Sequence, residues 1–291
     1  MQVVFHTGSH CTSEDLLMKS LLQNKDAFAK LGIALPGPGR YRELLKQTCR
    51  ALDYNKPSDD ARDVLLDAIL DEEVADRVLL SSAPILASRN YTLSEGQLYP
   101  NAGLRISQLQ QLFKYDQLEV FMAIRNPATF LPEVMAKVPP ELKAQALAET
   151  DLTELKWSDT ITQIRHHAPD VPVTVWCYED APLIWAEIIR EMAGLNPGEK
   201  IKGGFALLSE IMTKEGMKRF RTYLHEKPEM PEVQKRRVMA AFLDKFAIDD
   251  MVEDELDLDG WTDELVDEMT ERYEEDTYVI QQMPGVNLIA P

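Results

Sequence analysis

The fold is constrained most by short apolar segments that alternate with amphipathic ones along the first two thirds of the chain. Buried strands are predicted at 3–5, 77–86, 118–127 and 171–180. Helical patterns lie near 42–53, 58–74 and 101–114, and further helices begin at Glu14 and Pro127 and after the fourth strand. Strands separated by helices usually pair in parallel, and the helices then cover both faces. The pattern predicts an α/β protein with a three-layer α/β/α core around a central parallel sheet.

The last third of the sequence has a different pattern. Beyond about residue 200 no strand is predicted, and helical periodicity lies near 204–226, 231–246 and 261–280. We therefore expect an α/β core at 1–200 and a C-terminal helical region at 201–291.

The net charge of −18 is concentrated in one segment. Residues 247–276 hold 15 acidic side chains and a single basic one, Arg272. A solvated helix face is the favoured interpretation, and docking on the basic region 214–245 or on a protein partner is the alternative. Nucleic-acid binding is disfavoured, because contacts with phosphates need a basic face.

The composition indicates a globular protein, with 45% apolar residues. No apolar run approaches the roughly 18–20 residues that a membrane span needs, so no membrane association is expected. The first residues lack the pattern of a signal peptide. Cys11, Cys49 and Cys177 are few and widely spaced, which favours reduced thiols in the cytoplasm, and no metal-ligand spacing is present.

The N-terminal segment MQVVFHTGSHCTSEDLL combines a strand, a glycine-containing loop and the start of a helix. This geometry can hold a phosphate group on free backbone N–H groups. Gly8, Ser9, Thr12 and Ser13 are the loop residues placed to do so. The chain also sets two carboxylates, at residues 14 and 15, where such a phosphate would arrive.

Three stretches together resemble the sulfotransferase superfamily, in particular its bacterial members. They are VVFHTGSHCTSEDLLMKSLLQNKDAFAKLGIALP, VFMAIRNPATFL and VPVTVWCYED. The resemblance covers roughly residues 2–195 and implies a P-loop-like fold. It further implies sulfuryl transfer from 3′-phosphoadenosine 5′-phosphosulfate (PAPS) to a hydroxyl acceptor, with loop residues 8, 9, 12 and 13 on the phosphosulfate. Arg125 would then bind the 3′-phosphate of PAPS or of its product 3′,5′-ADP.

The loop departs from the family pattern, which reads approximately Gly-x-x-Lys-Thr-Gly-Thr-Thr. Cys11 stands at the lysine position, Ser13 at the second glycine, and Glu14 and Asp15 at the two hydroxyl residues. The lysine would hold positive charge over the developing anion, and groups of this kind commonly contribute about 10²–10³ in rate. A cysteine supplies no such charge.

The surroundings of the loop depart as well. Glu133 stands eight residues after Arg125, where the family has a serine, and no general base follows the strand at 81–84. Arg89 and Arg105 are predicted to flank the mouth of the pocket, where they would meet an anion or pair with Glu133.

Within the loop, His10 is the weak candidate for the missing cation and Cys11 for a reactive thiol at a helix N-terminus. An alternative interpretation is a capping box, in which Thr12 accepts from the N–H of Asp15 and Asp15 reaches back. Two functions therefore stay open: a PAPS-dependent sulfotransferase, and a catalytically inactive binding or interaction module with the same fold. A nucleotide kinase or NTPase ranks lower, because the Walker lysine and the Mg²⁺-binding hydroxyl after it are missing.

Overall fold

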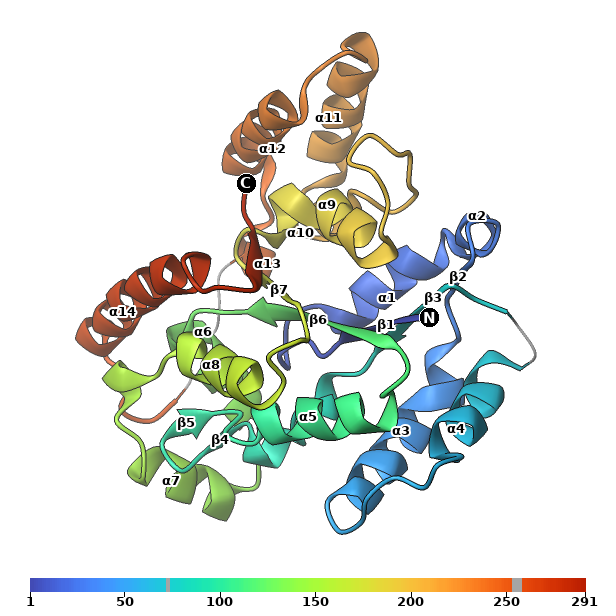
Figure 1. Cartoon of the computed structure of the whole chain (residues 1–291). Coiled ribbons are helices and arrows are strands. Elements are labelled where there is room, and N and C mark those ends of the chain that lie inside the picture. The colour runs from blue at the N-terminus through green and yellow to red at the C-terminus, as the bar shows by residue number, and fades with distance from the viewer. Residues whose placement is uncertain (72–73, 253–257) are drawn as a thin grey trace.

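A six-stranded parallel sheet forms the centre of the protein (Figure 1). The computed structural model describes residues 1–71, 74–252 and 258–291. The strand order is β2-β3-β1-β6-β7-β8, and every neighbouring pair runs parallel. The strands are β1 (Gln2–His6), β2 (Ile33–Ala34), β3 (Arg77–Ser81), β6 (Gln117–Ile124), β7 (Val173–Cys177) and β8 (Val286–Ile289). A separate antiparallel ribbon consists of β4 (Leu93–Ser94) and β5 (Gln97–Leu98).

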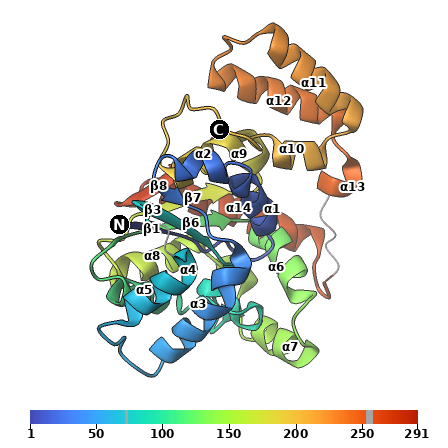
Figure 2. The same ribbon diagram turned by 90° about the vertical axis from the view of Figure 1, so that its right-hand side faces the viewer.

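Helices surround this sheet on both faces (Figure 2). In the first half of the chain they are α1 (Glu14–Leu22), α2 (Lys25–Ala29), α3 (Pro38–Leu52), α4 (Ala61–Leu70), α5 (Ala102–Leu112), α6 (Pro127–Met135) and α7 (Pro140–Ala148). In the second half they are α8 (Trp157–His167), α9 (Ala181–Ala193), α10 (Ala206–Ile211), α11 (Lys214–Glu226), α12 (Glu232–Phe246), α13 (Asp249–Val252) and α14 (Asp263–Gln281). Short 3-10 turns are η1 (Ala83–Ile85), η2 (Arg89–Tyr91) and η3 (Leu152–Glu154).

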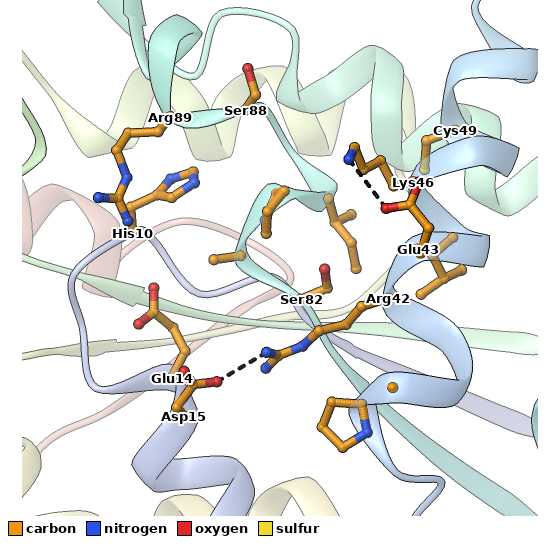
Figure 3. A pocket seen from close by; sticks show the side chains of 16 residues that line it. His10, Glu14, Asp15, Arg42, Glu43, Lys46, Cys49, Ser82, Ser88 and Arg89 are labelled. Atoms are coloured by element: carbon orange, nitrogen blue, oxygen red, sulfur yellow. Dashed lines mark hydrogen bonds and ion pairs between the residues drawn. The ribbon is translucent and has the colours of Figure 1, made fainter. Parts of the chain in front are cut away.

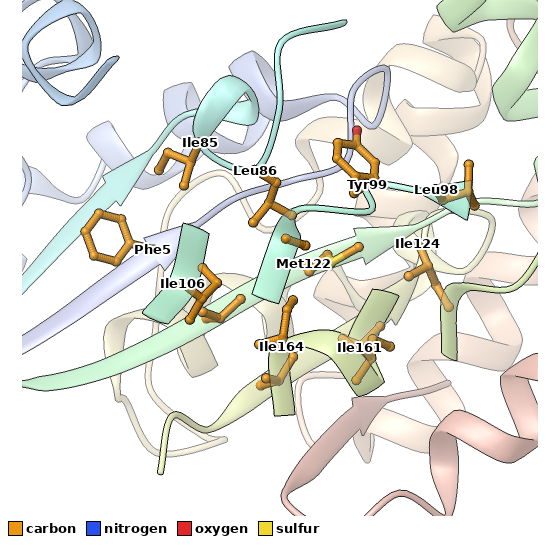
Figure 4. Close-up of a cluster of buried hydrophobic side chains, with 14 of the residues drawn as sticks. Phe5, Ile85, Leu86, Leu98, Tyr99, Ile106, Met122, Ile124, Ile161 and Ile164 are labelled. Carbon is orange, nitrogen blue, oxygen red and sulfur yellow. The ribbon is translucent and has the colours of Figure 1, made fainter. Parts of the chain in front are cut away.

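The side chains of β1 show how the two layers arise. Successive residues of a strand point to opposite faces, and a parallel sheet covered on both faces is apolar throughout. Val3 and Phe5 belong to the core under α3, α5 and α8, part of which is drawn in Figure 4. Val4 belongs to the other core, under α1 and α9. The prediction of a P-loop-like three-layer α/β/α fold is therefore confirmed.

Element boundaries differ from the predictions where proline intervenes. The strand predicted at 77–86 ends at Ser81, because Pro84 cannot donate to a ladder and lies in η1. The helix predicted from 42 begins at Pro38, whose fixed φ suits the first turn of a helix.

The C-terminal third contributes to the sheet, which the sequence did not predict. β8 pairs with β7 in parallel register, from Val173 opposite Val286 to Trp176 opposite Ile289. The expectation of no strand beyond residue 200 was wrong, because β8 is a four-residue edge strand with little apolar periodicity. Among the described residues, no helix is long and apolar enough to cross a membrane.

Most of the described acidic segment packs on the core rather than on the basic region 214–245. Helix α14 contacts α6, α8, η3 and β8, whereas α11 and α12 contact each other and share a small apolar cluster with Leu208 of α10. Helix α14 therefore packs against the α/β core and is not docked on the basic region 214–245. Residues 253–257 of the acidic segment lie outside the described residues.

Candidate functional site

The N-terminal loop, residues 7–13, lies at the carboxyl end of β1, between the ends of β3 and β6 (Figure 1). The chain order reverses at this point of the sheet, since β1 is flanked by β3 on one side and β6 on the other. In open α/β sheets, ligands bind in the crevice beyond the strand ends at such a switch point.

The loop has an unusual backbone. Gly8, Cys11 and Ser13 all have left-handed conformations, with φ of 61°, 62° and 58°. A left-handed conformation costs a non-glycine residue roughly 1–2 kcal/mol. Such residues cluster at functional sites and persist only where the surroundings impose them.

Hydrogen bonds hold the loop in this conformation. The backbone N–H of His10 donates to the Tyr99 hydroxyl at 2.9 Å, and the Thr12 hydroxyl donates to the carbonyl of Ser9 at 2.7 Å. The hydroxyls of Ser13 and Tyr178 are 3.0 Å apart. Ser9 is fully buried, and its hydroxyl has no partner among the described residues. The loop is therefore anchored by Tyr99, which follows β5, by Tyr178, which follows β7, and by a bond within the loop.

The predicted capping box is wrong. Ser13 occupies the N-cap of α1 without a side-chain cap, and its left-handed turn separates Thr12 from the first turn of the helix. Thr12 bonds to Ser9 instead. Asp15 points away from the loop and forms an ion pair with Arg42 at 3.0 Å.

The side chain of Glu14 lies over the loop, beside Gly8. A methyl group built on Gly8 would lie 3.1 Å from Cγ and 3.8 Å from Oε1 of Glu14, so the glutamate covers the glycine. Burial raises the pKa of Glu14, while hydrogen bonds from the N–H groups of Glu14 itself and Thr12 oppose this rise. A carboxylate of the chain thus occupies the anion position of the loop.

Neither catalytic candidate of the loop has the required charge. Burial, with a contribution from Arg89, lowers the pKa of His10 to about 4, so its imidazole is neutral at pH 7. Burial and the carboxylate of Glu133 raise the pKa of Cys11 to about 12, which keeps the thiol protonated. These pKa shifts favour neither a substitute cation at His10 nor a reactive thiolate at Cys11.

Arg125 is bound by the protein. Its guanidinium forms an ion pair with Glu133, donates to the carbonyl of Cys11 at 2.8 Å and to the Thr129 hydroxyl at 3.1 Å. It also lies over the ring of Tyr178, 5.1 Å from the centroid. The guanidinium that the resemblance assigns to the 3′-phosphate is thus paired with Glu133.

A cleft of about 790 Å³ opens beside the loop, between α3, the end of β3 and the η1–η2 segment (Figure 3). Two of its cations are paired inside the cleft: Arg42 with Asp15 at 3.0 Å and Lys46 with Glu43 at 3.2 Å. Apolar side chains and hydroxyls complete the lining. They include Leu45, Pro84, Ile85, Ser82 and Ser88.

The two arginines predicted at the pocket mouth differ. Arg89 lines the cleft, and no ion pair joins it to any residue that the structure describes. Arg105 lies elsewhere, where it donates to the carbonyl of Cys49 at 2.6 Å and pairs with Asp53 at 3.0 Å. It meets neither the cleft nor Glu133.

Sequence reasoning missed the two tyrosines that fix the loop. Tyr99 is buried with φ of 48°, and its hydroxyl is 2.7 Å from Nδ1 of His10 as well as bonded to the His10 backbone. Tyr178 follows β7 and meets Ser13. Both lie far from the loop in sequence, so no local pattern points to them.

No protein-family model and no curated protein matches this chain. The described residues also hold no group of three or more His, Cys, Asp or Glu side chains that could bind a metal ion. The chemistry of the site therefore follows from the geometry of the loop and the cleft.

Proposed function

We propose that this chain is a catalytically inactive binding protein with a sulfotransferase-like fold, which takes a small ligand in the cleft beside its N-terminal loop. One observation carries the proposal: the carboxylate of Glu14 covers Gly8, where the resemblance would put the phosphosulfate of PAPS. Two anions about 4 Å apart repel by roughly 4 kcal/mol at an effective dielectric constant of 20. Residues 7–13 of the loop themselves supply no cation to offset this repulsion, because His10 is neutral and Cys11 replaces the lysine.

The residues around the loop also do not fit the nucleotide. The guanidinium of Arg125, expected on the 3′-phosphate, is already bound to Glu133 and to the carbonyl of Cys11. A 3′-phosphate would have to displace a carboxylate from a buried arginine. Binding of PAPS or 3′,5′-ADP is therefore unfavourable at both ends of the molecule.

Calorimetry with 3′,5′-ADP tests the proposal. The wild type is expected to give no binding heat at millimolar nucleotide. A variant with Cys11→Lys, Ser13→Gly, Glu14→Thr and Asp15→Thr is expected to bind and to melt at a temperature that rises with nucleotide concentration. Cys11→Lys alone is the matched control, because the new ammonium would pair with Glu14 and leave the anion position filled. Binding of 3′,5′-ADP to the wild type would contradict the proposal.

Sulfuryl transfer from PAPS to a hydroxyl acceptor is the second candidate function. It is favoured by Arg89, an arginine beside the loop that has no ion-pair partner among the described residues. On this reading Arg89 would replace the missing lysine. The same titration separates the two candidates, since a transferase must bind its nucleotide product.

The proposal extends to location and partners. A cytoplasmic location is supported by the three cysteines, which are all free thiols. A protein partner through the acidic segment is supported by the exposed carboxylates of α14, among them Glu264, Glu268 and Glu271.

A further inference from the structure

The charged side chains of the cleft balance one another. Three cations, Arg42, Lys46 and Arg89, face three carboxylates, and His10 adds no charge at pH 7. Two cations are neutralised by Asp15 and Glu43 within the cleft.

The remaining cation is Arg89 and the remaining carboxylate is Glu14, which accepts hydrogen bonds from the backbone N–H groups of Glu14 and Thr12 but forms no ion pair with a described residue. No ion pair joins them, although Arg89 is close enough to lower the pKa of Glu14. In Figure 3 the carboxylate of Glu14 is directed toward the side of the cleft where Arg89 and His10 lie, while Asp15 turns to Arg42. Arg89 and Glu14 therefore present charges of opposite sign to the same side of the cleft.

This arrangement selects the charge of the occupant. A phosphate or sulfate would gain the guanidinium of Arg89 but would be repelled by Glu14, and a plain amine would meet the reverse conflict. A molecule that carries one carboxylate and one ammonium group satisfies both. The guanidinium of an arginine suits a carboxylate especially well, because its N–H groups match the two oxygens.

The wall of the cleft supplies the remaining selectivity. Leu45, Pro84 and Ile85 also line the cleft, whose volume is about 790 Å³. Burial of an apolar side chain against these residues would add to the affinity.

We propose that the cleft binds a zwitterionic amino carboxylate with an apolar side chain, such as an aliphatic amino acid, with its carboxylate on Arg89 and its ammonium group on Glu14. This inference rests on the proposed function, because it assigns the ligand class of the same cleft.

Calorimetry with three related probes tests it: L-leucine, N-acetyl-L-leucine and L-leucinamide. Only L-leucine carries both charges, and it is expected to bind more tightly than either single-charge probe. Arg89→Gln should weaken L-leucine about 10- to 100-fold, the effect of losing a charged hydrogen bond. Glu14→Gln should weaken L-leucine but not N-acetyl-L-leucine. Arg237→Gln, an exposed arginine on α12 far from the cleft, is the matched control and should leave binding unchanged.

Equal binding of L-leucine and N-acetyl-L-leucine to the wild type would overturn the assignment of Glu14 to an ammonium group. The absence of any binding of L-leucine would overturn the inference as a whole and leave the proposed function standing. Binding of 3′,5′-ADP would contradict the proposed function itself, so the two failures give different results.

Discussion

Arg125 and Glu133 form an ion pair in which the arginine is 4% exposed and the glutamate 45% exposed. The arginine directly follows β6 and the glutamate lies on α6, so the pair joins the end of the strand to the helix that follows it. The guanidinium also reaches back to the carbonyl of Cys11. The position that the resemblance gives to a nucleotide phosphate is thereby filled by a carboxylate of the protein.

Arg125→Ala is expected to lower the free energy of unfolding by about 2–3 kcal/mol, because the charged hydrogen bonds to Glu133 and Cys11 are lost together. The half-exposed carboxylate of Glu133 is then solvated, which limits the cost. Denaturant unfolding measures the change. In the double variant with Glu133→Gln the loss should be smaller than the sum of the single losses by about 1 kcal/mol. Strictly additive losses would show that the pair contributes no coupling.

The buried histidines His6 and His10, in β1 and the loop that follows it, are expected to lower the stability of the fold in acid. Burial lowers the pKa of His6 to about 3 and that of His10 to about 4, whereas both titrate near 6.5 in the unfolded chain. Below pH 6.5 the unfolded state binds more protons, so stability falls as pH drops toward 4. For His10 the loss amounts to about 3 kcal/mol, from a shift of roughly 2.5 pKa units.

Thermal melts between pH 4 and pH 7 check this expectation. His10→Gln should flatten the dependence on pH, whereas the exposed His166→Gln should follow the wild type. A slope that is the same in all three proteins would contradict the assignment.

The α/β core could be predicted because its strands are apolar on both faces and its helices are not. The apolar residues of β1, β3, β6 and β7 stand out from the sequence for this reason. β8 could not be predicted, since an edge strand of four residues buries only Ile289 and gains its place from pairing with β7.

The position of the site could be predicted from the sequence, but the arrangement of its side chains could not. Gly8 and the following helix identified the loop, and the family pattern pointed to Arg125 and showed that Glu133 stands where a serine was expected. The role of Glu14 could not be read from the sequence, because it depends on the left-handed turn at Ser13. The conformation of Ser13 is held by a tertiary contact, the hydrogen bond between the hydroxyls of Ser13 and Tyr178.

Asp276 is expected to stabilise the fold from α14. Its Oδ2 atom accepts hydrogen bonds from the backbone N–H groups of Trp157 at 2.7 Å and Ser158 at 3.0 Å. These are the first two residues of α8. Asp276→Ala should therefore cost about 1–2 kcal/mol, the range for losing an N-terminal cap. Asp276→Asn retains an acceptor and should cost less. Glu275→Ala, which removes only an exposed pair with Arg272, should change stability little in the same unfolding measurement. Equal losses for Asp276→Ala and Glu275→Ala would contradict the capping role.

Glu14 is expected to make folding stability depend on pH in the direction opposite to that of the histidines. Burial raises the pKa of Glu14 in the folded state above its ordinary value of 4.5. The folded state then binds the proton more tightly, so the associated stability is fully present below pH 4.5 and is lost as pH rises through the raised pKa. At pH 7 an ionised Glu14 therefore destabilises the fold. Glu14→Gln should melt above the wild type at pH 7.

The two melting curves should converge below pH 4.5, where the glutamate of the wild type is protonated in both states. Asp15→Asn is the matched control, since this neighbouring carboxylate is exposed and paired with Arg42. It should show no gain at pH 7, because it loses that pair. If Glu14→Gln were instead less stable than the wild type at pH 7, the ionised carboxylate would be stabilised by the loop. Gly8 and its neighbours would then form a stronger anion site than the burial of Glu14 implies.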